Sequence, residues 1–122
     1  MGSRDWDLSL RDVGHLACQM RGFPGVGLLT RQGKLIAVNV GRNRAFRAML
    51  VTLAPGKSAY FTFEFESAGP CIPRDYSFYG LEIYPPNDRG RLVLHIGQTG
   101  VCDVAISGTP SVTPVRASKE LG

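Results

Sequence analysis

The sequence lacks the features that define membrane and helical proteins. None of its apolar runs approaches the roughly 18 residues of a membrane-spanning helix. No stretch of about 12 residues repeats its apolar positions at helical spacing. The start of the chain has no apolar segment like that of a signal peptide. A predominantly helical fold is therefore excluded, and we expect any signal or lipoprotein leader to lie outside this chain.

The sequence also has little net charge and few cysteines. Its 14 basic and 10 acidic residues give a formal net charge of +4, which is too small to indicate nucleic-acid binding by itself. The three cysteines, Cys18, Cys71 and Cys102, are too far apart for a zinc motif. An odd number is compatible with one disulfide and one remaining thiol in an exported protein, or with three reduced thiols in a cytosolic one.

The sequence does contain clear alternation at a period of two residues. In residues 58–66, four apolar side chains share one face and polar side chains share the other, as in a half-buried strand. Four further segments alternate in the same way. The inward residues of all five segments are expected to be Ala59, Phe61, Phe63 and Phe65; Trp6, Leu8 and Leu10; Leu16, Cys18 and Met20; Tyr79, Leu81 and Ile83; and Leu92, Leu94 and Ile96.

The spacing of these segments predicts the fold class. About eight strands, separated by turns rich in glycine and proline, indicate an all-β protein built as an antiparallel sandwich or barrel. Gly33 and Gly56 stand where tight turns need a positive φ, and residues 43–50 are the best candidate for a short helix. Because the chain has no repeat and no linker, we expect one domain over residues 1–122, with flexible ends at 1–4 and 117–122.

Several motifs occur in an order that is typical of one protein family. They are CQMRGFPGVGLL (18–29), VTLAPGKSAYFTFEF (51–65), LEIYPP (81–86) and VTPV (112–115), with Cys71 before LEIYPP and Cys102 after it. In this order the chain resembles the bacterial family called domain of unknown function 4232. The resemblance implies an immunoglobulin-like β-sandwich in a secreted or cell-envelope protein, and it implies no particular activity.

The chain departs from the family pattern at its start. Members usually open with an additional strand that carries another cysteine, whereas this chain begins at what corresponds to the second strand. We therefore expect one cysteine without its usual partner. We also expect an uncovered sheet edge, which invites pairing with another chain.

The cysteines and the 18–29 segment have structural interpretations. Cys71 and Cys102 bracket a hairpin-rich segment and are our first choice for a disulfide, with Cys18–Cys71 as the competing pair. The segment is expected to form a corner between two strands, because its glycines allow a bend, its proline fixes φ and its phenylalanine fills the space. The corner residues are Cys18, Gly22, Phe23, Pro24 and Gly25.

Residues for catalysis or metal binding do not form a convincing set. No nucleophile-elbow, phosphate-loop or metalloprotease motif occurs. His15, His95 and Cys102 are residue types of a blue-copper site, but the close cluster of ligands that usually follows the cysteine is missing. Glu64 and Glu66 share the polar face of a strand and are expected to be solvated rather than hydrolytic. We therefore expect a non-enzymatic protein without metal or cofactor; a cupredoxin-like or hydrolytic domain is the least favoured alternative.

Two segments are candidates for binding. Arg42, Arg44 and Arg47 lie close together in the sequence with an aromatic residue among them, and such a group can hold phosphate or stack on a ring. Tyr76 and Phe78 crowd a second segment, where exposed rings would provide a platform for sugar or protein. The alternatives are a solvated loop for the arginines and core packing for the aromatic residues.

Together these observations favour a non-catalytic module. We expect it to bind a protein, a glycan or an anionic polymer of the cell envelope through loops at one end of a rigid sandwich. The alternative is a structural or self-associating scaffold domain of a larger envelope protein. The expected partners include no specific nucleic acid, and no membrane except through a removed leader or lipid anchor. The chain is expected to be a monomer or a weak dimer formed through its exposed edge strand.

Overall fold

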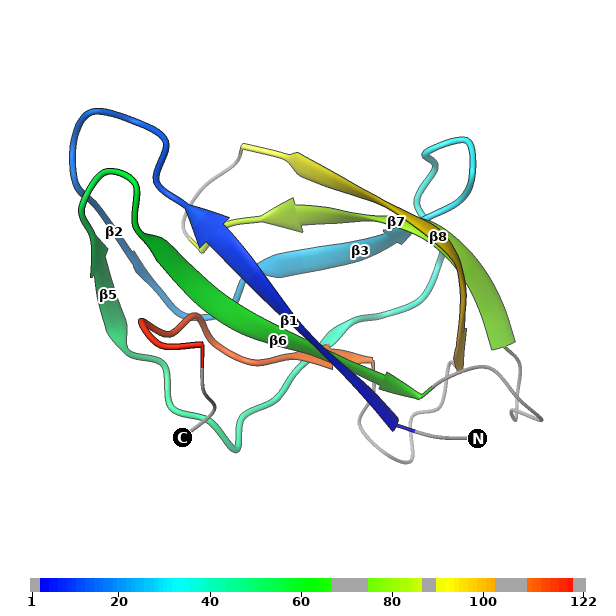
Figure 1. Ribbon diagram of the computed structural model, residues 1–122. Coiled ribbons are helices and arrows are strands. Elements are labelled where there is room, and N and C mark those ends of the chain that lie inside the picture. Colours follow the sequence, from blue (N-terminus) through cyan, green and yellow to red (C-terminus); the bar gives the residue numbers. More distant parts are fainter. Residues whose placement is uncertain (1–2, 67–74, 87–89, 103–109, 120–122) are drawn as a thin grey trace.

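The computed structural model describes residues 3–66, 75–86, 90–102 and 110–119. Within these ranges the chain forms nine strands and no helix (Figure 1). The strands are β1 (Ser3–Arg11), β2 (Cys18–Arg21), β3 (Gly25–Leu29), β4 (Gly41–Arg42), β5 (Leu50–Leu53), β6 (Ser58–Glu66), β7 (Asp75–Tyr84), β8 (Leu92–Cys102) and β9 (Ser111–Val112). Thus no described segment is a helix of the length and apolarity that a membrane span requires.

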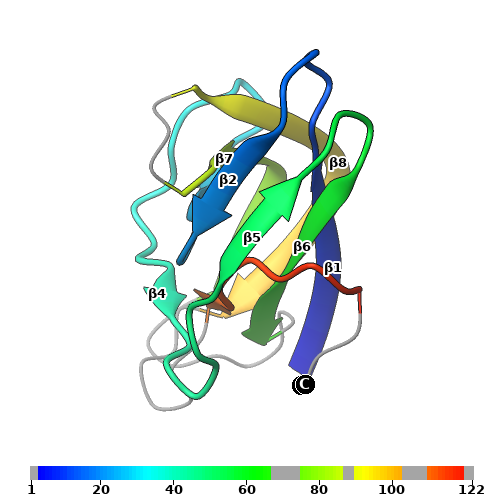
Figure 2. The ribbon, with the colours of Figure 1, turned by 90° about the vertical axis from the view of Figure 1, so that its left-hand side faces the viewer.

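The strands form three sheets, which are arranged in two layers. The orders are β1-β6-β9-β4, β2-β5 and β3-β7-β8. Figure 2 shows β5, β6 and β1 side by side on one layer, with β7 and β8 behind them. The all-β class and the predicted antiparallel sandwich are confirmed. One pair departs from the prediction, because β4 runs parallel to β9.

Strand β6 forms the centre of the core, as its alternation predicts. Ala59, Phe61, Phe63 and Phe65 are all fully buried. The rings of Phe63 and Phe65 stack with their centroids 5.2 Å apart, and Trp6 of β1 meets Phe65 edge-on at 4.9 Å. Strand β6 pairs with β1 without interruption from Ser58 to Glu66, and burial of its four apolar side chains stabilises this pairing.

In strand β7, the side chains that face the core differ in part from those that the alternation predicts. Phe78 is fully buried, whereas Tyr79 is only half-buried. The cause is an irregularity in the ladder between β7 and β8, where the register shifts between Phe78 and Gly80. The shift moves the inward position from even to odd residue numbers, so Leu81 and Ile83 are buried as predicted. The prediction that Tyr79 faces the core, and that Phe78 offers an exposed ring, is therefore wrong.

Three leucines that the alternation places inside are exposed. Leu16 is 82% exposed because β2 begins only at Cys18, and Leu16 belongs to the preceding bend. Leu92 and Leu94 are 48% and 37% exposed. They lie on β8, which is the outer strand of its sheet. Ile96, farther along the same strand, packs against the core as predicted.

The predicted turns place glycine where the backbone needs it. Gly33 and Gly56 have φ values of 82° and 83°, as the turn motifs predict. Gly22 has φ of 104° and begins the connection from β2 to β3. The short helix candidate at residues 43–50 is instead a turn followed by extended chain that enters β5.

Candidate functional site

The arginine loop, which we define as residues 41–47, is fixed to the sandwich by hydrogen bonds at its start. The amide of Gly41 donates to the carbonyl of Pro110 at 2.8 Å, and the amide of Asn43 donates to the carbonyl of Val112 at 2.8 Å. The Asn43 side chain donates to Glu64 Oε1 at 2.7 Å and accepts from the amide of Ala45 at 3.0 Å. The loop is therefore positioned by β6 and β9.

Two of the three arginines converge on the aromatic ring of the β2–β3 corner. The guanidinium carbon of Arg42 lies 5.4 Å from the centroid of Phe23, and that of Arg44 lies 6.0 Å from it. Phe23 is partly buried and also packs against the hydrophobic core. Stacking on a ring orients a guanidinium while leaving its N–H groups available for an anion.

The two arginines that contact Phe23 have no carboxylate to neutralise them in the described part of the chain. The ion pairs there join Arg91 to Glu82 and Arg116 to Asp7. Arg42 and Arg44 are both exposed. We call Arg42, Arg44 and Phe23 the cationic platform. Its two positive charges on one ring, which have no carboxylate partner among the described residues, favour a ligand with a negative charge.

The third arginine borders an apolar hollow beside the platform. Arg47 lines a cavity of about 410 Å³ together with Phe46, Met49, Leu50 and Val115. Met49 and Leu50 are 63% and 58% exposed. The hollow gives a partner an apolar surface next to the positive charges, which suits a segment that carries both apolar and acidic groups.

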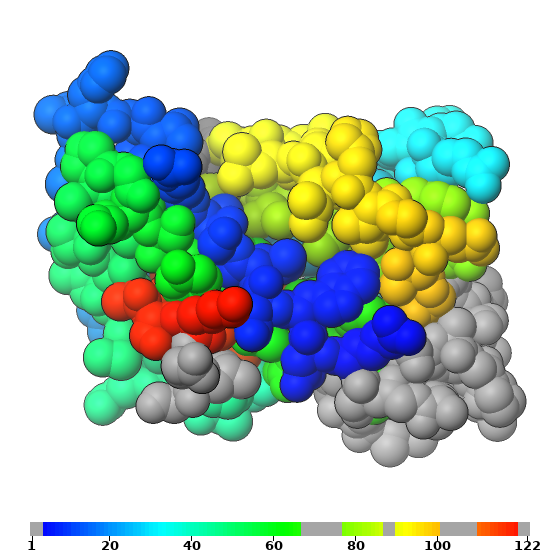
Figure 3. All heavy atoms as spheres, in the orientation of Figure 1, coloured from blue at the N-terminus to red at the C-terminus, as the bar shows by residue number. Residues whose placement is uncertain are grey.

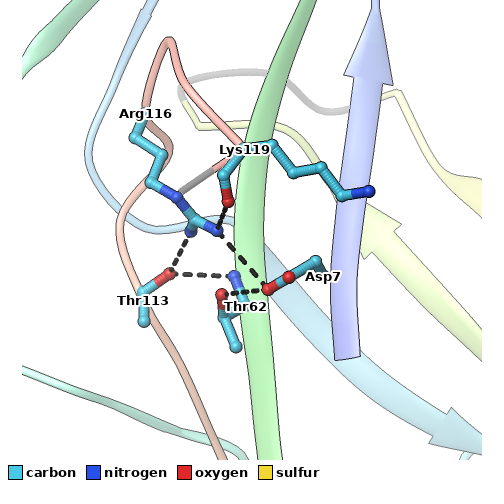
Figure 4. A network of polar contacts seen from close by, with 5 residues as sticks. All are labelled: Asp7, Thr62, Thr113, Arg116 and Lys119. Atoms are coloured by element: carbon cyan, nitrogen blue, oxygen red, sulfur yellow. Dashed lines mark hydrogen bonds and ion pairs between the residues drawn. The ribbon is translucent and has the colours of Figure 1, made fainter. Parts of the chain in front are cut away.

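A polar network on the outer face of the four-stranded sheet ties the end of the described chain to β6 and β1 (Figure 4). Thr113 Oγ1 accepts a hydrogen bond from the amide of Thr62 at 2.9 Å and from Arg116 Nη1 at 3.3 Å. Asp7 Oδ1 accepts from Thr62 Oγ1 at 2.8 Å and lies 3.5 Å from Arg116 Nη2. Arg116 also donates to the carbonyl of Lys119 at 2.8 Å. These contacts fix the strand pairing that supports the arginine loop.

A second pairing of cation and ring lies on the three-stranded sheet. The guanidinium of Arg31 stands 4.9 Å from the Tyr79 centroid and donates to its hydroxyl at 3.5 Å. Arg91 and His95 line the same shallow hollow of about 310 Å³. Sequence reasoning missed this pair, because Arg31 and Tyr79 are far apart in the chain and the alternation placed Tyr79 inside.

The remaining predicted site residues divide into three groups. Phe78 belongs to the core and cannot form a binding platform. Cys71 and the side chains of Tyr76 and Cys102 lie outside the described residues, so the Cys71–Cys102 disulfide stays a prediction. Cys18 has a free thiol, which excludes the competing Cys18–Cys71 pair.

The titratable residues that were considered for chemistry do not come together. His15 and His95 are exposed and lie on different segments, and Glu64 is bonded to Asn43. In the ranges that the structure covers, no group of three His, Cys, Asp or Glu side chains could hold a metal ion. The arrangement of the described residues thus offers ion pairing and apolar contact.

The Cys18 thiol lies on β2 against Leu53 of β5, where it packs on the edge of the core. Burial raises the pKa of this thiol, and the negative charge of Asp12 with a hydrogen bond to its carboxylate raises the pKa further. A raised pKa means less thiolate at neutral pH, which is the opposite of an activated nucleophile.

Alkylation of Cys18 is therefore expected to be slow at pH 7. The pH at which its rate reaches half of the maximum (the midpoint) should lie above that of an ordinary thiol. The rate is measured with iodoacetamide as a function of pH, by mass spectrometry of the peptide that contains Cys18. Asp12→Asn should lower the midpoint, because it removes the negative charge beside the thiol. A midpoint below the ordinary range in the unmodified chain would show an activated cysteine and contradict this assignment.

Comparison with known families gives one match. The family model described as Domain of unknown function (DUF4232) matches residues 1–116. This range contains the corner, the arginine loop and the strands of the core. A search of curated proteins and a search of solved structures returned no match to this chain.

Proposed function

This chain belongs to the DUF4232 family, and we propose that it is a non-catalytic module that binds an anionic partner through the cationic platform. The partner is a polymer or an acidic protein segment that contacts Arg42 and Arg44 first. The adjoining hollow at Arg47 accepts the apolar part of such a segment. As part of the same proposal, the module works at the cell envelope or in the secreted state, in keeping with the resemblance of its sequence motifs to exported domains.

One observation carries this proposal: two arginines without carboxylate partners in the described residues converge on a single phenyl ring. Two exposed cations that both lie within about 6 Å of the same ring centroid repel each other, so this arrangement has an electrostatic cost that a bound anion reduces. The anchored loop keeps them together before binding, which reduces the entropy lost on association. A glycan without charge would leave the guanidinium charges unused and fits the platform less well.

The Arg42→Glu/Arg44→Glu variant tests the platform. With inorganic polyphosphate and poly-L-glutamate as probes, it should bind at least about tenfold more weakly than the unmodified chain at low salt. The affinity of the unmodified chain should fall as salt is raised, because the contacts are ionic. Binding is measured by isothermal titration calorimetry.

The matched control is Lys34→Glu/Lys57→Glu, which has the same formal net charge but changes two exposed turn residues. It should bind within about twofold of the unmodified chain, because overall charge acts weakly on a local site. Equal losses in both double variants would show that net charge alone attracts the probes, and the proposal would then be rejected.

A further inference from the structure

Strands β1 and β8 are the outer strands of their sheets on the same side of the sandwich. β1 ends the order β1-β6-β9-β4, and β8 ends the order β3-β7-β8. Figure 3 shows β1 (blue) and the yellow first half of β8 next to each other on the near face. In the described part of the chain, no strand pairs with the outer side of either one.

The outer backbone groups of β1 are directed away from the sheet. Thr62 and Tyr60 of β6 lie opposite Asp7 and Ser9. The backbone of Tyr60 exchanges hydrogen bonds with Arg116 at 2.8 Å, so it points away from β1. Residues of an antiparallel ladder point alternately toward and away from the neighbouring strand. The N–H and C=O groups of Asp7 and Ser9 therefore point out of the free edge.

An apolar seam lies beneath this edge, between β1 and β8. Trp6, Leu8, Leu94 and Ile96 line a hollow of about 510 Å³, which Asp5, Asp7, Gln98 and Thr99 also border. A second hollow of about 340 Å³ continues it between Leu8 and Leu10 on β1 and Leu92 on β8. Partly exposed leucines along an unpaired edge are typical of a surface that another chain covers.

The charges along β1 are self-complementary when two copies run antiparallel. With the two-fold axis at Leu8, Asp5 faces Arg11 of the second copy and Asp7 faces Ser9. On the inner face, Trp6 lies opposite Leu10. Since the sequence of β1 reads SRDWDLSLR, both ends of the pair then bring opposite charges together.

Two neighbouring registers also keep the polar side chains of β1 on one face and the apolar side chains on the other. Both pair the side chains less favourably. A shift toward the start of the strand places the axis at Asp7, so two carboxylates face each other. A shift the other way, to an axis at Ser9, pairs Asp7 with Arg11, but it leaves Asp5 opposite Val13 and places Trp6 opposite Asp12 of the second copy. Like charges directly opposite destabilise a strand pair, and opposite charges stabilise it. Charge thus disfavours the axis at Asp7, the apolar face disfavours the axis at Ser9, and the two together favour the axis at Leu8.

We propose that two copies of this chain form a two-fold dimer by antiparallel pairing of β1 with β1, in the register that pairs Asp5 with Arg11. The pairing joins two four-stranded sheets into one continuous sheet and covers the seam leucines. Such an interface is isologous, so it closes at two copies. The proposal does not depend on the cationic platform, which lies at the other edge of the sheet, beside β4.

Charge exchange within β1 tests the dimer and its register together. Sedimentation equilibrium should show a concentration-dependent dimer for the unmodified chain. Asp5→Arg and Arg11→Asp should each weaken it about tenfold, because each variant places like charges opposite each other twice per dimer. The double variant Asp5→Arg/Arg11→Asp restores both pairs with reversed polarity and should return the dissociation constant to within about threefold.

Two controls keep the test decisive. Lys34→Glu, in an exposed turn, should leave the dissociation constant unchanged. Thermal melts should show that every variant folds, since Asp5 and Arg11 are exposed. A chain that stays monomeric up to about 1 mM would overturn the proposal. A dimer that responds to neither single variant, or one that the double variant does not restore, would overturn the register.

Discussion

Replacing Phe78 with alanine should lower the free energy of unfolding by about 3–5 kcal/mol. Phe78 is fully buried, and its ring lies 5.8 Å from both Trp6 and Phe65 and 6.4 Å from Phe63 between centroids. Alanine would leave a cavity where the two sheets meet and would remove three ring contacts. Because domains of this size are stable by only about 5–15 kcal/mol, urea unfolding should show a large decrease in the midpoint.

Tyr79→Ala is the matched control on the neighbouring residue. Tyr79 is half-buried and its ring contacts the guanidinium of Arg31, so its loss should cost about 1 kcal/mol or less. Phe78→Leu should fall between the two, which keeps the comparison measurable if the alanine variant does not fold. A larger effect at Tyr79 than at Phe78 would mean that the strand faces the core as plain alternation predicts.

Replacing Thr113 with valine should cost about 1–3 kcal/mol, although the two side chains have nearly the same shape. Thr113 is buried, and its hydroxyl oxygen is the acceptor for the buried amide of Thr62 and for Arg116. Valine removes the acceptor and leaves the amide without a partner inside the protein (Figure 4). Urea unfolding at constant pH measures the loss.

The control for this substitution is Thr52→Val. Thr52 is exposed and its hydroxyl accepts from Gln19 at 3.4 Å, a bond that water replaces easily. Its substitution should change the free energy of unfolding by no more than about 0.5 kcal/mol. Equal effects at Thr113 and Thr52 would show that the network on the outer face of the sheet does not contribute to stability.

The strands that pack on one side only could be predicted from the sequence. Residues 58–66 and the inward side chains Trp6, Leu8 and Leu10 follow the alternation, because the apolar face of each strand packs on the core. Alternation fails at Phe78, where a register shift changes the inward face. It also fails along β8, because whether an outer strand is covered depends on the neighbouring sheet and is not encoded within the strand itself.

The candidate site could be predicted only in part. The density of arginine in residues 42–47 pointed to binding, but Phe23 was assigned only to the corner. The two come together because β4 pairs with β9 and the carbonyl of Gly22 accepts from the amide of Val115. Likewise, the role of Arg116 follows from long-range pairing of the last described segment with β6. Contacts between distant segments leave no local signature in a single sequence.

The most direct test of the cationic platform is a map of where an anion binds. A solution NMR titration of the unmodified, isotope-labelled chain with inorganic polyphosphate reports every amide and arginine side chain at once. The largest chemical-shift changes should fall on residues 41–47 and on Phe23, because the platform joins these two segments. Changes centred on Arg31 and Arg91, or spread evenly over the basic residues, would contradict the proposed site.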